Sequence, residues 1–85
     1  MIAIFTVGAD EIRIKQMEKI AEAWGFAGKY MDSKILLNDA KKKRFNSVLV
    51  MDQEALDDNA KMELKNLGIE IIDFRNKKVL EKKIL

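Results

Sequence analysis

The chain has 85 residues, of which 16 are basic and 14 acidic, so its formal net charge is +2. That length allows one folded domain, residues 1–85, with a small core and a thin margin of stability. The balanced charge excludes the large basic excess of a dedicated nucleic-acid-binding domain. The lack of cysteine and histidine excludes disulfides, thiol nucleophiles and the commonest general base and zinc ligand.

Composition also bears on location. A chain without cysteine fits a reducing compartment, so we predict a cytoplasmic protein. No apolar run is long enough to span a bilayer. The apolar start of the chain has no basic flank and is soon followed by Asp10 and Glu11. Neither a signal peptide nor a membrane partner is therefore expected.

Apolar runs alternate with helical patterns along the chain, which is typical of an α/β fold. Residues 2–7 are almost continuously apolar, as in a central strand. Residues 10–24 follow as a predicted helix, with Asp10 able to cap its start and Gly25 placed where a helix usually ends. Residues 28–31 predict a short second strand.

The second helix is predicted to begin at Ser33, as its N-cap, and to close at the basic run 41–44. Residues 45–51 predict the third strand. Residues 53–67 then predict a helix, and residues 69–74 the fourth strand.

The end of the chain allows two interpretations. Residues 79–85 fit a short helix or a strand that returns antiparallel at the sheet edge. We favour the edge strand, because the lysines around it oppose edge-to-edge pairing. The prediction is a single small α/β domain with a mainly parallel four-stranded sheet, order 2-1-3-4. Helices cover both faces through right-handed crossovers.

The helix and strand patterns also predict which side chains face inward. Methionines are added to this set, because they commonly fill irregular gaps in cores. The predicted core includes Ile4, Trp24, Val48, Val50, Ile71, Met17, Met31, Met51 and Met62.

Three aspartates, Asp10, Asp32 and Asp52, each follow a predicted strand. The carboxyl ends of parallel strands meet at one edge, where α/β proteins bind ligands. Three carboxylates there would suit Mg²⁺ in a metal-dependent enzyme or phospho-acceptor. The alternative, which we favour, is that they cap helices, and no cofactor is expected.

The basic run consists of Lys41, Lys42, Lys43 and Arg44. Such a run is a candidate for weak nucleic-acid binding through phosphate contacts. It has no interleaved aromatic residues, and it is equally typical of a solvated helix end. We favour the solvated helix end.

Several segments resemble the catalytic domain of serine recombinases, the resolvase/invertase family, in order and spacing. Residues 4–8 (Ile-Phe-Thr-Val-Gly) resemble that family's Tyr-x-Arg-Val-Ser, which contains the nucleophilic serine. Residues 45–52 resemble its Phe-Asp-x-Leu-Val-Val-x-Asp strand. Residues 54–59 resemble its Asp-Arg-Leu-x-Arg-Asn, and Leu67-Gly68-Ile69 resembles the Leu-Gly-Val before its fourth strand.

The departures from the family pattern decide the expected function. Gly8 stands where the resemblance puts the serine, and Thr6, Ala55 and Asp58 stand where it puts arginines. Phosphoryl transfer by a serine needs that hydroxyl and cations that hold the phosphate. The resemblance implies a truncated domain without the chemistry, so we do not expect an enzyme. We expect an interaction or regulatory module, encoded by a mobile element, that pairs with itself or with a protein partner such as an intact recombinase.

Overall fold

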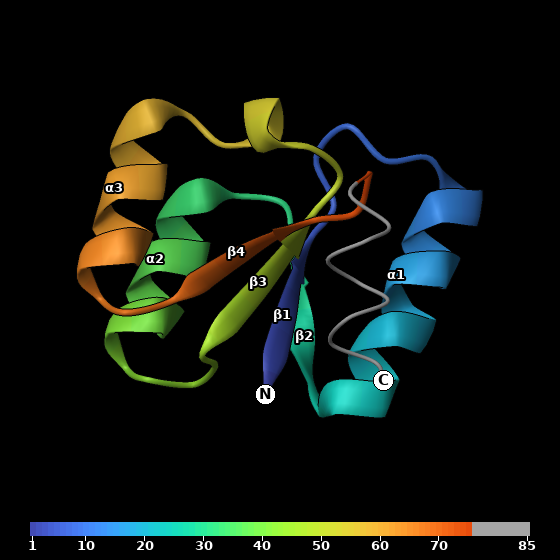
Figure 1. Ribbon diagram of the computed structural model, residues 1–85, viewed down its shortest axis with the longest axis horizontal. Coiled ribbons are helices and arrows are strands. Elements are labelled where there is room, and N and C mark those ends of the chain that lie inside the picture. The colour runs from blue at the N-terminus through green and yellow to red at the C-terminus, as the bar shows by residue number, and fades with distance from the viewer. Residues whose placement is uncertain (76–85) are drawn as a thin grey trace.

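A computed structural model gives the structure of residues 1–75, in which a parallel sheet lies between two layers of helices (Figure 1). The elements in chain order are β1 (Ile2–Phe5), α1 (Glu11–Trp24), β2 (Phe26–Tyr30), α2 (Ser33–Lys41), β3 (Ser47–Val50), the 3₁₀ turn η1 (Gln53–Ala55), α3 (Asp58–Asn66) and β4 (Glu70–Asp73). The sheet order is β2-β1-β3-β4, and the three pairings are parallel. The predicted order is confirmed. The predicted edge strand at 79–85 lies outside the described residues.

The strand β1 is buried on both sides, which explains its unbroken apolar sequence. Ile2 and Ile4 point to the layer formed by α1. Ala3 and Phe5 point to the opposite layer, formed by α2 and α3. Figure 1 shows α1 on one side of the sheet and the α2–α3 pair on the other.

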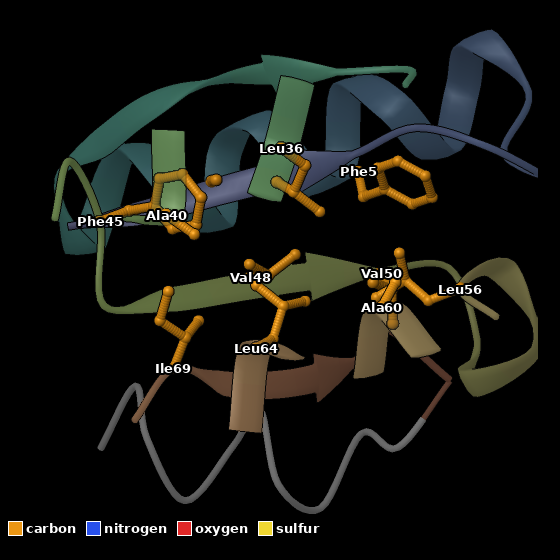
Figure 2. Close-up of a cluster of buried hydrophobic side chains, with 11 residues drawn as sticks. Phe5, Leu36, Ala40, Phe45, Val48, Val50, Leu56, Ala60, Leu64 and Ile69 are labelled. Carbon is orange, nitrogen blue, oxygen red and sulfur yellow. The ribbon is translucent and has the colours of Figure 1, made fainter. Parts of the chain in front are cut away.

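Two hydrophobic clusters fill the space between the sheet and these layers. The smaller one, on the α1 side, contains Ile2, Ile4, Met17, Ala21, Leu49 and Ile72. The larger one joins α2 and α3 to the sheet, as Figure 2 shows, and contains Ala3, Phe5, Leu36, Ala40, Phe45, Val48, Val50, Leu56, Ala60, Leu64 and Ile69.

Most of the predicted core is confirmed. Ile4, Val48 and Val50 are buried, as are Met17 and Met51, while Trp24 and Ile71 are half-buried and pack at the margins of the clusters.

Two methionines contradict the core prediction, because Met31 is 79% exposed and Met62 is 63% exposed. Met31 follows the last residue of β2 and lies beyond the sheet. Met62 lies between Ala60 and Leu64, which are the buried residues of α3. A residue two positions from each of them points to the other side of a helix.

The second strand begins earlier than predicted. Gly25 ends α1 with a φ of 94°, and the chain then turns at once into Phe26, which pairs with Ile2. The register shifts after this pair, so that Ala3 is opposite Gly28 and Ala27 is the extra residue of a β-bulge.

The predicted cap of α2 is also corrected. The cap is Asp32 and not Ser33, because the Asp32 carboxylate accepts a hydrogen bond of 2.8 Å from the Lys34 backbone N–H.

The continuous helix predicted at 53–67 is wrong. The chain forms the short turn η1, becomes extended at Leu56 and starts α3 at Asp58. Burial of Leu56 in the larger cluster favours the extended backbone there. Asp57 then caps α3, since its carboxylate accepts a hydrogen bond of 2.7 Å from the Ala60 N–H.

Candidate functional site

The strand order places a topological switch point between β1 and β3. The connection from β1 runs through α1 on one face, and the connection into β3 runs through α2 on the other (Figure 1). In α/β sheets this geometry leaves room for a ligand at the carboxyl ends of the two strands. The loops at residues 6–10 and 51–57 therefore form the candidate site, and the resemblance to serine recombinases points to the same loops.

The three candidate aspartates are all caps. Asp10 accepts a hydrogen bond of 2.9 Å from the Arg13 N–H. Asp32 accepts one from the start of α2, and Asp52 accepts one of 2.9 Å from the Glu54 N–H. These bonds satisfy backbone donors at the starts of α1, α2 and η1 that have no partner within the helix.

Two of these carboxylates are also paired with guanidinium groups. Asp10 lies 2.8 Å from Arg13, and Asp52 lies 3.5 Å from Arg75. The hydrogen bond from the Arg13 backbone lowers the pKa of Asp10 below its ordinary value, and the Arg13 charge acts in the same direction. Within residues 1–75, no group of three or more Asp, Glu, His or Cys side chains is placed to hold a metal ion.

The segment after β1 offers little that could react with a ligand. Thr6 is buried, and its hydroxyl donates a hydrogen bond of 3.4 Å to the Tyr30 carbonyl of the neighbouring strand. Gly8 has a φ of 83°, and a Cβ added there would contact nothing within 4 Å. Gly8 therefore serves a turn with a left-handed backbone, and the space around it is open.

The segment after β3 is acidic. Ala55 is half-buried at the end of η1, and Asp58 is exposed in the first turn of α3. A carboxylate at that position favours the helix, because it faces the positive end of the helix dipole. The same carboxylate repels a phosphate.

The basic run lies at the opposite side of the sheet, where the strands begin, which we call the amino edge. Lys41 ends α2, Lys42 is its C-cap, and Lys43 and Arg44 lead toward β3. All four side chains are exposed, and Arg44 lies 3.8 Å from Asp39. The structure thus separates the basic candidates from the three aspartates by the length of the sheet.

Sequence reasoning missed a polar contact that ties β2 to α2. The Tyr30 hydroxyl donates a hydrogen bond of 2.6 Å to the Asp39 carboxylate. Burial, together with the negative charge of Asp39, raises the pKa of Tyr30 to about 12. The Tyr30 ring also packs against Phe45, with 5.7 Å between the ring centroids. The nine-residue separation of Tyr30 and Asp39 fits no local pairing rule, so the sequence carries no signal for the contact.

Comparison with known proteins gives no relative: no protein-family model, no curated protein and no solved structure matches the chain. The similarity to serine recombinases therefore stays a prediction from the sequence. In the part of the chain that the structure describes, no helix is both long and apolar enough to cross a membrane.

Proposed function

We propose that this domain is a non-catalytic, serine-recombinase-like module that acts by binding a protein, either a partner or a second copy of itself. The observation that carries the proposal concerns the side of the sheet where the strands end and where Asp10, Asp32 and Asp52 lie, which we call the carboxyl edge. Its three aspartates are used as helix caps, and the arginines nearest to two of them are already ion-paired.

Phosphoryl transfer would need more than this edge offers. It needs an accessible nucleophile and cations that hold the phosphate and neutralise the developing charge. Gly8 has no hydroxyl, and the Thr6 hydroxyl is turned into the sheet. Arg13 and Arg75 are each paired with a carboxylate that would compete with a phosphate. These contacts favour binding over catalysis.

Exposed apolar side chains support a role in protein binding. Four of them come from the segments that follow β1 and β2: Val7, Ile12, Met31 and Ile35 are between 40% and 79% exposed. Single exposed apolar residues are ordinary, but protein-binding surfaces commonly group them near polar residues.

A second candidate function is weak nucleic-acid binding through Lys41–Arg44, because these four cations are exposed on one helix end. Phe45, the aromatic residue next to them, is 4% exposed and offers no face on which a base could stack. Binding would then rest on phosphate contacts alone. We expect any affinity for a DNA duplex, measured by fluorescence anisotropy, to fall steeply with salt.

The catalytic prediction concerns Gly8→Ser. We expect neither the unmodified chain nor Gly8→Ser to form a covalent adduct with recombination-site DNA on a denaturing gel. The new hydroxyl would have no arginine beside it, since Ala55 and Asp58 occupy the positions where the resemblance puts arginines. Loss of such groups costs orders of magnitude in rate.

The matched variant is the triple change Gly8→Ser, Ala55→Arg, Asp58→Arg. We expect it to bind DNA more tightly through added positive charge and still to form no adduct, because Thr6 remains. An adduct from the unmodified chain, or a serine-linked adduct from Gly8→Ser, contradicts the non-catalytic proposal.

A further inference from the structure

A pocket of about 350 Å³ opens at the amino edge of the sheet, between the ends of α2 and α3. In Figure 1 this edge carries the turn from α3 into β4 and the loop from α2 into β3. Two cations, Lys43 and Arg44, line the pocket. Its apolar lining comes from Met1, Ala40, Phe45, Leu67 and Ile69.

The two helices that border this pocket end in the same way. At the end of α2, the Lys43 N–H donates to the Ala40 carbonyl, and at the end of α3 the Gly68 N–H donates to the Lys65 carbonyl. In both helices the next N–H reaches the carbonyl five residues back. Both are therefore Schellman motifs, which need a left-handed residue and usually take glycine.

The motif at the end of α3 uses Gly68, with a φ of 77°, but the motif at the end of α2 uses Lys43, with a φ of 59°. A left-handed backbone is strained for a residue other than glycine, because the Cβ lies too close to the following carbonyl oxygen. Lys43 is exposed, and no ion-pair partner for it is present among residues 1–75. Lys43 thus lines the pocket from a strained position, and its charge has no ion-pair partner within the described part of the chain.

The carboxyl edge carries charges opposite in sign to those of the pocket. Glu11, Glu54 and Asp58 are exposed there and form no ion pair within the described residues. The Thr6 N–H donates a hydrogen bond to the Tyr30 carbonyl across β1 and β2. Val7 follows Thr6 and Met31 follows Tyr30, so both come just after paired residues. Within residues 1–75, the carboxyl edge therefore combines exposed carboxylates that form no ion pair with exposed apolar side chains.

The free edge of β2 is a poorer surface for association. Its bulge at Ala27 breaks the regular ladder, and Lys29 on this strand is held 2.9 Å from Glu18. Bulges and lysines are two features that oppose edge-to-edge pairing of strands.

We propose that copies of this domain associate head to tail, with the acidic, apolar carboxyl edge of one copy against the basic pocket of the next. The occupant is a second copy because this chain itself carries both complementary surfaces. The contact joins two different surfaces, so it does not close at a dimer and longer assemblies form as concentration rises. The inference rests on the proposed protein-binding function and specifies its partner.

The first experiment is sedimentation velocity of the full chain over a range of concentrations, at about 0.05 M and about 0.5 M salt. We expect the weight-average sedimentation coefficient to rise with concentration at low salt and to fall back toward the monomer at high salt. A chain that stays monomeric under both conditions overturns the proposal. A dimer that resists salt and does not grow also overturns it.

The most informative variant is Lys43→Gly. Glycine relieves the left-handed strain, so this variant should melt at a higher temperature, and loss of the charge should weaken association about tenfold. Lys42→Ala is the matched control, because it removes the same charge one residue away and Lys42 does not line the pocket. Equal weakening by both changes would show that net charge, and not the pocket, drives the association, and would overturn the proposal.

Mixing variants tests both surfaces together. Lys43→Glu with Arg44→Glu removes the basic surface, and Glu54→Lys with Asp58→Lys removes the acidic one. Each double variant should be monomeric alone, and an equimolar mixture should form a complex, because each partner keeps one intact surface. Met31→Gln, at a position that is 79% exposed, offers a second carboxyl-edge variant with little risk to folding, and it should also weaken association. A mixture that stays monomeric, or an unaffected Met31→Gln, overturns the proposal.

The absence of self-association is distinguishable from failure of the proposed function. A strictly monomeric chain removes the second copy as the occupant and leaves a partner protein as the alternative. The non-catalytic proposal is tested by different measurements, namely covalent adduct formation with DNA and Mg²⁺ binding at Asp10, Asp32 and Asp52.

Discussion

Replacing Leu64 with alanine is expected to lower the free energy of unfolding by about 2–5 kcal/mol. Leu64 is fully buried, and from α3 it reaches into the larger hydrophobic cluster next to Val48 (Figure 2). The loss combines the burial of the removed methyl groups with the cavity that remains. In a domain this small, such a loss is a large part of the total stability.

Urea denaturation followed by circular dichroism measures this effect. The matched control is Met62→Ala, two residues away in the same helix, where the side chain is 63% exposed. We expect the control to change the free energy of unfolding by less than about 0.5 kcal/mol. Equal effects from the two variants would contradict the assignment of the buried face of α3.

The second large effect is expected from Tyr30→Phe, which should destabilise the domain by about 1–2 kcal/mol. The change keeps the ring against Phe45 and removes the hydroxyl that donates to Asp39. The Asp39 carboxylate is then left with Arg44 at 3.8 Å as its remaining ion-pair partner among residues 1–75. Chemical denaturation near neutral pH measures the loss.

The pH dependence of this contact follows from the raised pKa of Tyr30. The folded state holds the phenol proton more tightly than the unfolded state, in which the pKa is near 10.0. The stabilising effect is therefore fully present below about pH 10 and is lost as the pH rises through about 12. The stability difference between the unmodified chain and Tyr30→Phe should shrink over this interval.

The Asp39→Asn variant tests the cause of that shift. The amide oxygen still accepts a hydrogen bond but carries no charge, so the pKa of Tyr30 should fall toward its ordinary value. Ultraviolet titration of the single tyrosine follows this change directly. An unchanged tyrosine titration in Asp39→Asn would contradict the contact.

The fold was largely predictable because its central strands are buried on both faces. A strand such as β1 must be apolar along its whole length, and a short apolar run of this kind is typical of a central strand in a parallel sheet. The alternation with helices then favours a parallel sheet, and the right-handed crossover rule limits its order. Met62 was placed in the core because methionine commonly fills cores, although its position two residues from both Ala60 and Leu64 puts it on the opposite side of α3.

The break in the predicted helix at 53–67 could not be seen in the sequence. Leu56 falls at helical spacing from Ala60, so the pattern continues across the break. Tertiary contacts interrupt the helix. Leu56 is buried in the larger cluster with its backbone extended, and Asp57 then caps α3.

The candidate site was predictable only in part. The positions of Asp10 and Asp52 after their strands follow from the sequence, and so does their capping role. Their pairing with Arg13 and Arg75 depends on side-chain placement. The left-handed backbone of Lys43 and the pocket beside it depend on how α2 and α3 end next to each other, which no local pattern encodes.

We propose that this domain binds protein through its edges and not that it performs metal-dependent chemistry at the carboxyl edge. The most direct test is a set of amide NMR spectra of the full chain, recorded on dilution and again on addition of Mg²⁺. We predict that dilution shifts the amide signals of Lys43, Gly68 and Met31, whereas Mg²⁺ leaves those of Asp10, Asp32 and Asp52 in place. Saturable shifts at these three aspartates on addition of Mg²⁺, with no change on dilution, would contradict the account.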